Sequence, residues 1–403
     1  MISTDIVIVG GGCVGLTAAL ALAQQGMAVT VIDRAGGATS LDEPELRVSA
    51  ISAGSEQLLK SIGAWQHLDV ERLRAYDSMS VWDKESFGRI EFSANDVAEH
   101  RLGHIIDNNH IRNALLQQAE ASNNLTLLLE NEIASIHNDD EQVVLTLADG
   151  KPLIAKLLIA ADGANSWVRK QLGLTITFSD YDHHALVATV RTAVTHGNCA
   201  RQVFLPNGPL ALLPLYDESL CSIVWSTSPD EVIQLQQMDA AEFGKRLTAA
   251  SDSVLGPVEL ESARVSFPLT MRYAHTWVDN RVVLIGDAAH TIHPLAGLGM
   301  NLGLMDAAAL AQSISNKELL SSQRIQKSLR QYERWRKAEA QTFIAAMAGL
   351  KHLFDGQNPV KKLIRGVGLA LTNQTPVVKH QIIRHAMGVA GELPNLARAK
   401  DPI

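Results

Sequence analysis

The chain has 403 residues, of which 46% are hydrophobic and 19% are charged, and its formal net charge is −8. These proportions are typical of a globular protein with two or three domains and exclude a disordered or fibrous chain. The acidic balance argues against nucleic-acid binding, which needs a basic excess to hold the phosphate backbone.

Cysteine content and hydropathy indicate the cellular compartment in which the protein works. Cys13, Cys199 and Cys221 are too few and too scattered for a disulfide framework or a closed zinc site, so a reducing compartment is expected. No signal segment is found, and no apolar run approaches the ~20 residues that a bilayer requires. We therefore predict a cytoplasmic protein, at most peripheral to the inner membrane.

The first 33 residues predict a strand, a turn, a helix and a second strand. Residues 6–9 are apolar, an alanine- and leucine-rich helix follows and ends at Gly26, and residues 29–32 are apolar again. Strands that are apolar on both faces are typical of a covered parallel sheet, so this segment is predicted to be a βαβ unit.

The turn after the first strand carries the motif G-x-G-x-x-G. Gly10 permits a tight turn, Gly12 lets a pyrophosphate approach the backbone, and Gly15 lets the helix pack closely on the strand. Asp33 ends the second strand, where a carboxylate binds a ribose and repels a 2′-phosphate. The motif predicts FAD or NAD rather than NADP, and the alternative is a glycine turn that binds nothing.

The middle of the chain changes its pattern. Helices are predicted near residues 55–62 and 111–121, and buried strands at residues 125–129 and 153–160. Asp162 and Gly163 follow the last of these, either as ligands at a strand end or as a simple turn. Alternating strands then occupy residues 181–267, at 185–191, 210–215 and 221–225, and predict a separate antiparallel layer.

A third strand-end site follows the buried strand at residues 281–285. Gly286 and Asp287 end this strand, and a glycine-rich stretch leads to Asn301. A carboxylate here can bind polyol hydroxyls, and the glycines can begin a helix whose free amides face an anion. The alternative is a loop with a helix cap. A long helix is predicted around residues 325–353.

Three such sites over about 290 residues suit an extended FAD better than NAD. The predicted fold is α/β, with a Rossmann-like FAD-binding domain on a parallel sheet, interrupted by an antiparallel β-rich substrate domain and followed by C-terminal helices. The predicted boundaries are 1–75, 100–180 and 268–350 for the discontinuous FAD-binding domain, 76–99 and 181–267 for the substrate domain, and 351–403 for the C-terminal helical region.

The ordered set of these three sites resembles the single-component FAD-dependent aromatic hydroxylases of the para-hydroxybenzoate hydroxylase type. Within that group, residues 46–51, residues 286–296 and Gly303 are similar to the ubiquinone-biosynthesis hydroxylases. Residues 81–84, 183–189 and 221–225 most resemble the 2-octaprenylphenol hydroxylase branch. The resemblance runs from Asp5 to about Gly388.

The resemblance implies roles for single residues. Arg47 and Arg112 would contact the pyrophosphate or ribose of FAD, although solvated surface arginines are the alternative. Asp287 would bind the ribityl or pyrophosphate region. Leu298 stands where the family usually has Gln, and a leucine has no side-chain amide to take over any role of that Gln. The backbone donors of residues 297–300 remain available to the flavin. The predicted cofactor site comprises Gly10, Gly12, Gly15, Asp33, Arg47, Arg112, Asp162, Gly163, Gly286, Asp287, Pro294, Gly297, Leu298, Gly299, Met300 and Asn301, and no metal ligand is predicted.

The activity implied is NAD(P)H- and FAD-dependent hydroxylation of a polyprenylated phenol in ubiquinone biosynthesis. NADPH or NADH would visit the flavin transiently, since no second G-x-G-x-x-G unit is present. His183, His184, Tyr216 and His290 are possible proton-relay groups, but each is more readily structural, so no catalytic residue is named. The alternatives are a non-catalytic FAD-containing component of a quinone-biosynthesis assembly, and a flavin reductase or halogenase; the halogenase signature Trp-x-Trp-x-Ile-Pro is not found.

The C-terminal region is basic in an otherwise acidic chain. Residues 351–387 hold six Lys or Arg against one Asp, with apolar residues at helical spacing beside them. The pattern predicts either a helix that docks on a membrane or a partner, or an ordinary helix packed on the FAD domain.

Overall fold

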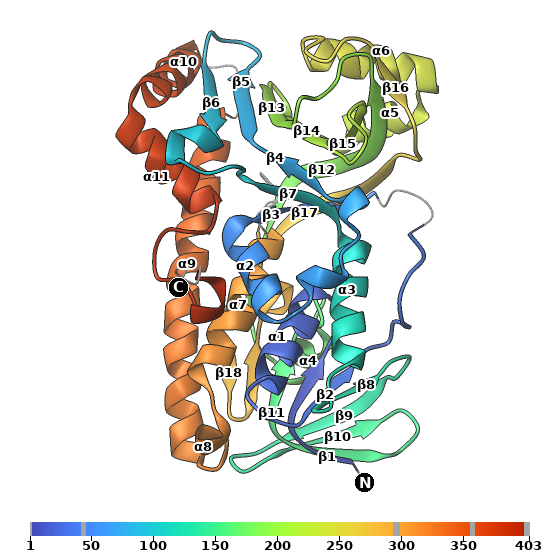
Figure 1. Ribbon diagram of the computed structural model, residues 1–403, viewed down its shortest axis with the longest axis vertical. Coiled ribbons are helices and arrows are strands. Elements are labelled where there is room, and N and C mark those ends of the chain that lie inside the picture. The colour runs from blue at the N-terminus through green and yellow to red at the C-terminus, as the bar shows by residue number, and fades with distance from the viewer. Residues whose placement is uncertain (1, 42–45, 293–298, 355–358, 399–403) are drawn as a thin grey trace.

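The computed structural model describes residues 2–41, 46–292, 299–354 and 359–398. It has a lower region built on one sheet and an upper region built on another, joined by long strands and flanked on one side by C-terminal helices (Figure 1). Both termini lie in or beside the lower region. The elements of the lower region are predicted in the right order, whereas several short strands are not predicted at all.

The lower region contains an eight-stranded sheet in the order β18-β19-β11-β1-β2-β8, with the β9–β10 hairpin added to β11. The neighbours β19, β11, β1, β2 and β8 are all parallel, which confirms the predicted βαβ unit and parallel sheet. The strands are β1 (Ile2–Val9), β2 (Val29–Ile32), β8 (Leu125–Leu128), β9 (Ile133–Asn138), β10 (Val143–Leu147), β11 (Pro152–Ala160), β18 (Val278–Asp279) and β19 (Val282–Leu284).

Burial on all sides explains the uniform hydrophobicity of this region. In β1 the side chains of Ile6, Val7 and Ile8 have no exposed surface. Helix α1 (Cys13–Ala23) is buried along nearly its whole length, because α3 and α7 pack against it as well as the sheet. The covering helices are α2 (Ala53–Ser61), α3 (Asn108–Glu120), α4 (Trp167–Gln171), α7 (Gly299–Ser313) and α8 (Asn316–Leu319).

The upper region is a nine-stranded sheet in the order β20-β17-β12-β15-β14-β13-β5-β6, with β16 beside β12. It is antiparallel except where β13 pairs with β5. Helices α5 (Pro229–Gln237) and α6 (Ala240–Ala250) cover one face and share a second core with it. Its strands are β5 (Ser78–Asp83), β6 (Arg89–Ser93), β12 (Ile176–Thr192), β13 (Cys199–Leu205), β14 (Gly208–Pro214), β15 (Leu220–Thr227), β16 (Val258–Leu260), β17 (Val265–Ala274) and β20 (His290–Thr291).

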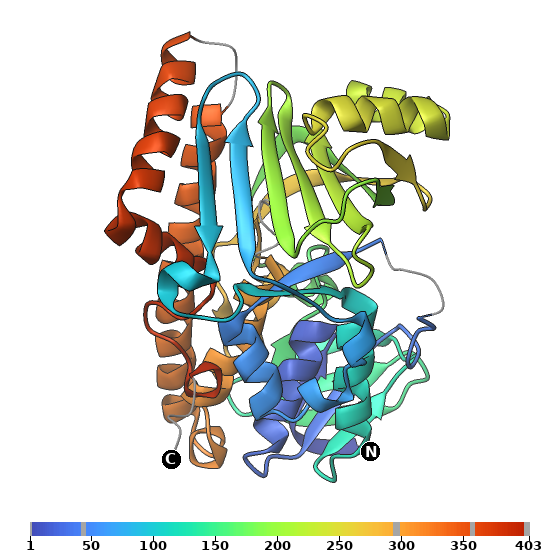
Figure 2. The same ribbon diagram turned by 45° about the horizontal axis from the view of Figure 1, so that its top comes forward.

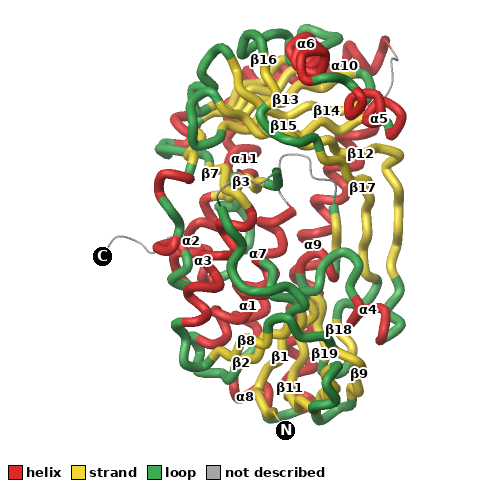
Figure 3. The backbone as a smooth tube through the Cα atoms, turned by 90° about the vertical axis from the view of Figure 1, so that its right-hand side faces the viewer, coloured by secondary structure: helices red, strands yellow, loops and turns green. Residues whose placement is uncertain are grey.

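The predicted boundaries at 180/181 and 267/268 fall inside strands. β12 and β17 pair with each other across both positions and run from the upper region down beside the lower one (Figure 3). A small third sheet, β3-β7-β4, lies between the regions. Its strands were not among those predicted: β3 (Val48–Ser52), β4 (Arg74–Tyr76) and β7 (Gly103–Asp107).

Three helices end the chain. The predicted long helix is α9 (Ser322–Phe354), whose 33 residues extend over about 50 Å along the side of both regions. Helices α10 (Pro359–Gln374) and α11 (Pro376–Ala386) lie beside the β5–β6 hairpin (Figure 2). Helix α10 also contacts α9, and the residue after α11, Met387, accepts a hydrogen bond from the Gly54 amide of α2, so these helices pack on both regions. Within the described part of the chain, no helix is long and apolar enough to cross a bilayer.

Candidate functional site

A cavity of about 690 Å³ separates the two main sheets. Its lower wall is made by the turns that follow β1, β11 and β19, which are parallel neighbours and so end at the same edge of the sheet. Its upper wall is made by side chains of β12, β13, β14, β15 and β17. Ligands of open α/β sheets bind outside the carboxyl ends of the strands, and this cavity lies there. The volume is within the range of small-molecule sites.

The glycine turn after β1 combines tight packing with one open position. Gly10 has a φ of +111°, and a Cβ on Gly10 or Gly15 would collide with the backbone of Ala161 or Gly10 respectively. Gly12, in contrast, has no atom near its would-be Cβ and lines the cavity. Gly12 is also the N-cap of α1, with no side-chain cap and no acidic residue in the first turn. The free amides of this helix are therefore available to an anion.

Asp33 and Arg112 both hold this turn in place. The carboxylate of Asp33 accepts a hydrogen bond from the Gly11 amide at 2.5 Å and another from the Ala35 amide at 2.8 Å. The guanidinium of Arg112 donates to the carbonyl of Gly11 at 2.9 Å and to the carbonyls of residues 36 and 37. Neither side chain is among those that line the cavity. Contact of either with a ribose or pyrophosphate stays a prediction.

Asp162 and Gly163 form the second turn, after β11. One carboxylate oxygen of Asp162 accepts from the amides of Trp167 at 2.7 Å and Val168 at 3.0 Å, which begins helix α4. The other oxygen is buried and has no hydrogen-bond partner among the described residues. Gly163 has a φ of +79° and open space toward the cavity. The pair is thus a turn whose backbone faces the cavity and whose carboxylate retains one free acceptor.

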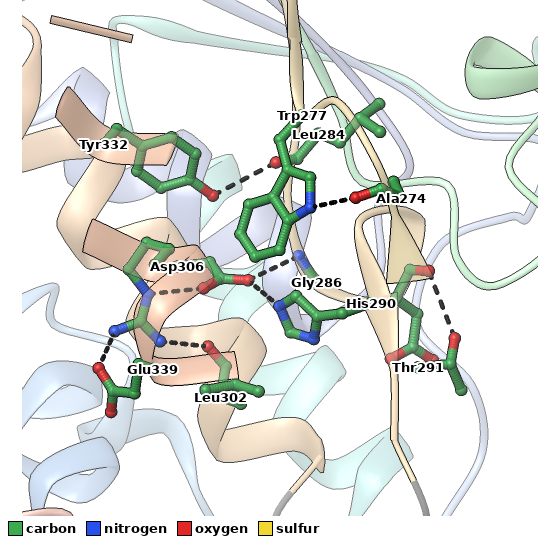
Figure 4. Close-up of polar contacts among 12 residues, drawn as sticks. Ala274, Trp277, Leu284, Gly286, His290, Thr291, Leu302, Asp306, Tyr332 and Glu339 are labelled. Atoms are coloured by element: carbon green, nitrogen blue, oxygen red, sulfur yellow. Dashed lines mark hydrogen bonds and ion pairs between the residues drawn. The ribbon is translucent and has the colours of Figure 1, made fainter. Parts of the chain in front are cut away.

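The third turn, Gly286–Ala288, lies over a buried ionic cluster (Figure 4). Asp306 of α7 is fully buried and accepts from the Gly286 amide at 3.0 Å and from Nε2 of His290 at 2.6 Å. Its second oxygen accepts from Nε of Arg336 at 2.7 Å, and Arg336 is itself fully buried on α9. The ring of Trp277 packs on His290 at 5.1 Å between centroids. We call Asp306, His290 and Arg336 the buried cluster.

Two carboxylates near this turn have opposite electrostatic environments. Burial alone would raise the pKa of Asp306, but the adjacent His290 and Arg336 outweigh it and hold this pKa below its ordinary value. Asp287 lies in the cavity wall, surrounded by protein although its side chain is exposed to the cavity. Burial raises the pKa of Asp287, and the more distant His290, Arg272 and Arg47 offset this only in part.

The N-terminus of α7 completes the lower wall. Gly299 and Met300 line the cavity, and the first turn of α7 holds no acidic residue. The side chain of Asn301 instead bridges the backbone of β3, accepting from the Ser52 amide at 2.9 Å and donating to the Ala50 carbonyl at 2.7 Å. Asn301 therefore fixes α7 against β3. Pro294, Gly297 and Leu298 lie outside the described residues.

Arg47 lies at the boundary of the two walls. It precedes β3, lines the cavity, and places its guanidinium 5.0 Å from the ring centroid of Phe267 on β17. Arg47 is thus an exposed arginine that also lines the cavity. The predicted site residues that line the cavity are Gly12, Arg47, Gly163, Asp287, Gly299 and Met300, while Gly10, Gly15, Asp33, Arg112, Asp162, Gly286 and Asn301 lie behind them.

The upper wall is mainly apolar and contains a residue that the sequence did not single out. Met79, Leu213 and Leu269 are among its apolar side chains. Tyr76 of β4 lines the same space, and burial raises the pKa of its phenol to about 12. Its hydroxyl is therefore protonated at neutral pH and can donate a hydrogen bond to a ligand. No sequence motif surrounds Tyr76, so no signal marked it.

The four proton-relay candidates from the sequence do not line the cavity. His290 is engaged by Asp306, and the ring of Tyr216 packs under the guanidinium of Arg72 at 5.7 Å. His183 and His184 lie on β12 and pair with Leu269 and Pro268 of the cavity wall, but they are not themselves among the lining residues. Among the described residues there is also no group of three or more side chains suited to a metal ion.

The cavity fits FAD on three observations. An uncapped helix N-terminus faces it at Gly12, where the space that a pyrophosphate needs is open. Asp162 keeps an unpaired buried oxygen beside the cavity. Backbone of three strand ends and of α7 lines one side of the same cavity. These groups would hold the adenine-side phosphates at Gly12 and the polyol chain near Asp287.

Comparisons with known proteins agree with this geometry. Residues 3–346 match the family described as FAD binding domain. The chain is 36% identical over 392 residues to 3-demethoxyubiquinol 3-hydroxylase of Escherichia coli, covering 96% of this chain and 99% of that protein. It is also 36% identical to the mitochondrial ubiquinone biosynthesis monooxygenase COQ6 of Xenopus tropicalis, covering 95% and 93% respectively.

A solved structure has the same fold. The p-nitrophenol 4-monooxygenase of Pseudomonas putida DLL-E4 superposes with a TM-score of 0.77 and 21% identity, covering 96% of this chain and 99% of that one. At that identity the match supports the fold. It confirms the predicted α/β architecture with a β-rich second region.

Proposed function

The chain belongs to the FAD binding domain family, and from that premise we propose that it is an FAD-dependent monooxygenase that hydroxylates the ring of a polyprenylated ubiquinone precursor. The reaction consumes NAD(P)H, a proton and O2, and it yields the hydroxylated ring, water and NAD(P)⁺. Two relatives that cover almost the whole chain carry ubiquinone-pathway hydroxylase names. The observation that carries the proposal is one cavity with an anion-binding lower wall and an apolar upper wall.

The lower wall would bind the cofactor. When bound, FAD supplies hydride acceptance from the nicotinamide and activation of O2. The amides at the start of α1 would bind the pyrophosphate, and Asp287 would accept hydrogen bonds from the polyol chain. The buried cluster holds Gly286, and thereby the backbone that presents Asp287, in a fixed position.

The upper wall would bind the phenol ring. Its apolar side chains exclude water from the reacting atoms, which prevents the loss of activated oxygen to solvent. The Tyr76 hydroxyl, which is protonated at neutral pH, would donate to the phenolic oxygen of the substrate. The geometry assigns no residue of the described chain as a proton acceptor.

NAD(P)H would visit the flavin transiently. The sequence contains no second G-x-G-x-x-G unit, so no dedicated nicotinamide fold is expected. Two further statements stay predictions: that the chain belongs to the 2-octaprenylphenol hydroxylase branch, and that it contacts a multiprotein assembly.

Product analysis tests the proposal. The FAD-loaded protein is incubated with NAD(P)H, isotopically labelled O2 and a short-chain prenylated phenol, and the products are analysed by mass spectrometry. We expect a ring product that contains one labelled oxygen atom. NAD(P)H oxidation that yields only hydrogen peroxide with every phenol tried would instead favour a flavin reductase, and absence of both reactions would favour a non-catalytic component.

A further inference from the structure

Helices α10 and α11 are fixed to the upper region by one face only. Arg365 of α10 is buried with Nε 3.4 Å from a carboxylate oxygen of Asp83, and Lys379 of α11 forms an ion pair with Asp96 at 2.8 Å. Gly366 lies so close to Phe87 that a Cβ there would touch the ring. Ile383 packs into a small core under α11. These contacts place the helices firmly against the β5–β6 hairpin.

The opposite face is apolar and open. Leu363, Val367 and Leu371 of α10 are spaced four residues apart and therefore form one stripe. The side chains of Leu363 and Leu371 are 60% and 58% exposed. On α11, Val377 is 69% exposed. We define the C-terminal apolar face as Leu363, Val367, Leu371, Val377, Val378 and Ile382.

This concentration is unusual for the molecule. Single exposed apolar side chains are ordinary on protein surfaces. Among the described residues, however, six of the thirteen large hydrophobic side chains that are exposed lie on these two short helices, and Phe87 of the adjacent hairpin is a seventh. Exposed apolar patches of this kind mark surfaces that contact a lipid or a partner.

Charge favours a lipid surface. Residues 359–386 contain no Asp or Glu in a chain whose net charge is −8, and they contain five Lys or Arg. Arg365 and Lys379 are already paired, and Arg384 is an additional, exposed cation on α11. An apolar face accompanied by cations is the signature of a helix that lies in the headgroup layer of an anionic bilayer.

The end of α11 also borders the cavity. Ala386, the last residue of α11, lines the cavity together with Tyr76 and Met79. Tyr76 and Met79 also pack against the small core that contains Ile383. The apolar wall of the cavity therefore continues directly beneath α11. A cavity of about 690 Å³ is sized for a drug-like ligand, and a long polyprenyl tail in addition to a flavin ring exceeds it.

We propose that the C-terminal apolar face docks on an anionic lipid bilayer, and that a polyprenylated substrate passes from that bilayer into the cavity beside Ala386. The substrate class in this inference rests on the proposed function. Docking itself rests on the exposed apolar stripe, the absence of acidic residues from residues 359–386 and the position of the end of α11 in the cavity wall. The tail would remain partly in the bilayer while the ring reaches the upper wall.

Vesicle binding tests the docking. The FAD-loaded protein is mixed with vesicles of phosphatidylglycerol and phosphatidylcholine, or of phosphatidylcholine alone, and bound protein is separated by flotation. We expect binding to the anionic vesicles to be at least about tenfold tighter. The double variant L371E/V377E should lose about tenfold or more of this binding. The matched control V70E/L320E changes two equally exposed apolar residues, 78% and 74% exposed, that lie elsewhere and should bind as the wild type does.

Activity measurements separate docking from chemistry. L371E/V377E should hydroxylate an unprenylated phenol in buffer at the wild-type rate and lose activity only on a long-chain substrate embedded in anionic vesicles. Equal vesicle binding by both double variants, or no binding by the wild type, would overturn the docking. A wild-type dimer that L371E/V377E converts to monomer in light scattering would also overturn it, because the face would then be an interface between copies. Vesicle binding without hydroxylation of any phenol would contradict the proposed function instead and leave the docking intact.

Discussion

The two walls of the cavity are built from different parts of the chain. The lower wall presents backbone: glycine turns, a helix N-terminus and the start of α7. Behind it lies the buried cluster, in which each ionised group is paired. The upper wall presents side chains of an antiparallel sheet, and Tyr76 and Met79 pack against a small apolar core. A ligand shared by many proteins can be held by backbone, whereas a particular ring must be selected by side chains.

The largest effect should come from breaking the support of the lower wall. Asp306→Asn leaves Arg336 and His290 without their carboxylate, and removal of one partner of a buried ion pair typically costs about 3 to 5 kcal/mol. We expect the free energy of unfolding in urea to fall by about that amount. Asp149→Asn, at an exposed pair with Lys151, is the matched control and should change stability much less than Asp306→Asn does. A similar small change for both variants would mean that the buried cluster does not stabilise this wall.

The next largest effect should be on FAD affinity, when a residue of the lower wall is changed. Gly12→Asp adds a side chain where space is open, so the fold should persist, but its charge would face the pyrophosphate. Like-charge juxtaposition costs several kcal/mol, so FAD affinity should fall about a hundredfold or more. Gly12→Ala, which adds only a methyl group, is the control. Affinity measured by flavin fluorescence that is unchanged in Gly12→Asp would contradict the placement of the pyrophosphate.

A smaller effect is expected at the upper wall. Tyr76→Phe removes one hydroxyl, and a hydrogen bond contributes roughly 0.5 to 1.5 kcal/mol, so kcat/KM for the phenol should fall about threefold to tenfold. FAD affinity and stability should not change. Tyr216→Phe is the control, because its ring packs under Arg72 outside the cavity. Equal losses in both variants would remove Tyr76 from the substrate site.

The smallest expected effect is on thermal stability, and it distinguishes Asp287 from Asp306. Burial raises the pKa of Asp287, so its ionised form destabilises the folded protein without cofactor, and that penalty grows as the pH rises above the ordinary range of an aspartate. Asp287→Asn should therefore raise the melting temperature of the FAD-free protein slightly at neutral pH, and the gain should vanish as the pH falls. The same variant should bind FAD more weakly. A lower melting temperature for Asp287→Asn at neutral pH would show that this carboxylate stabilises the fold.

The difference between the walls also explains what the sequence could predict. The glycine turns require particular residues, since a Cβ on Gly10 or Gly15 collides with backbone, and such requirements leave a readable motif. The parallel strands are uniformly apolar because their side chains are buried on both faces. Both features were predicted correctly from the sequence.

The remaining features depend on packing between distant segments. Asp306 and Arg336 lie 30 positions apart, and no short spacing relates them to the turn that they support. Tyr76 belongs to a three-residue strand whose partner, β7, lies almost 30 residues later. Asn301 was predicted as part of the cofactor site, and its side-chain amide bonds the backbone of β3 some 250 residues away. Tertiary contacts decide these roles, and local pattern does not contain them.

A crystal structure with FAD and an unreactive prenylated phenol bound would show whether one cavity holds both molecules. We expect the pyrophosphate within hydrogen-bond distance of the amides of Gly12 and Cys13, and the polyol chain beside Asp287. We expect the phenol to lie against Tyr76, with its tail leaving beside Ala386. FAD bound with its pyrophosphate away from the first turn of α1, or a phenol outside the cavity, would contradict this arrangement.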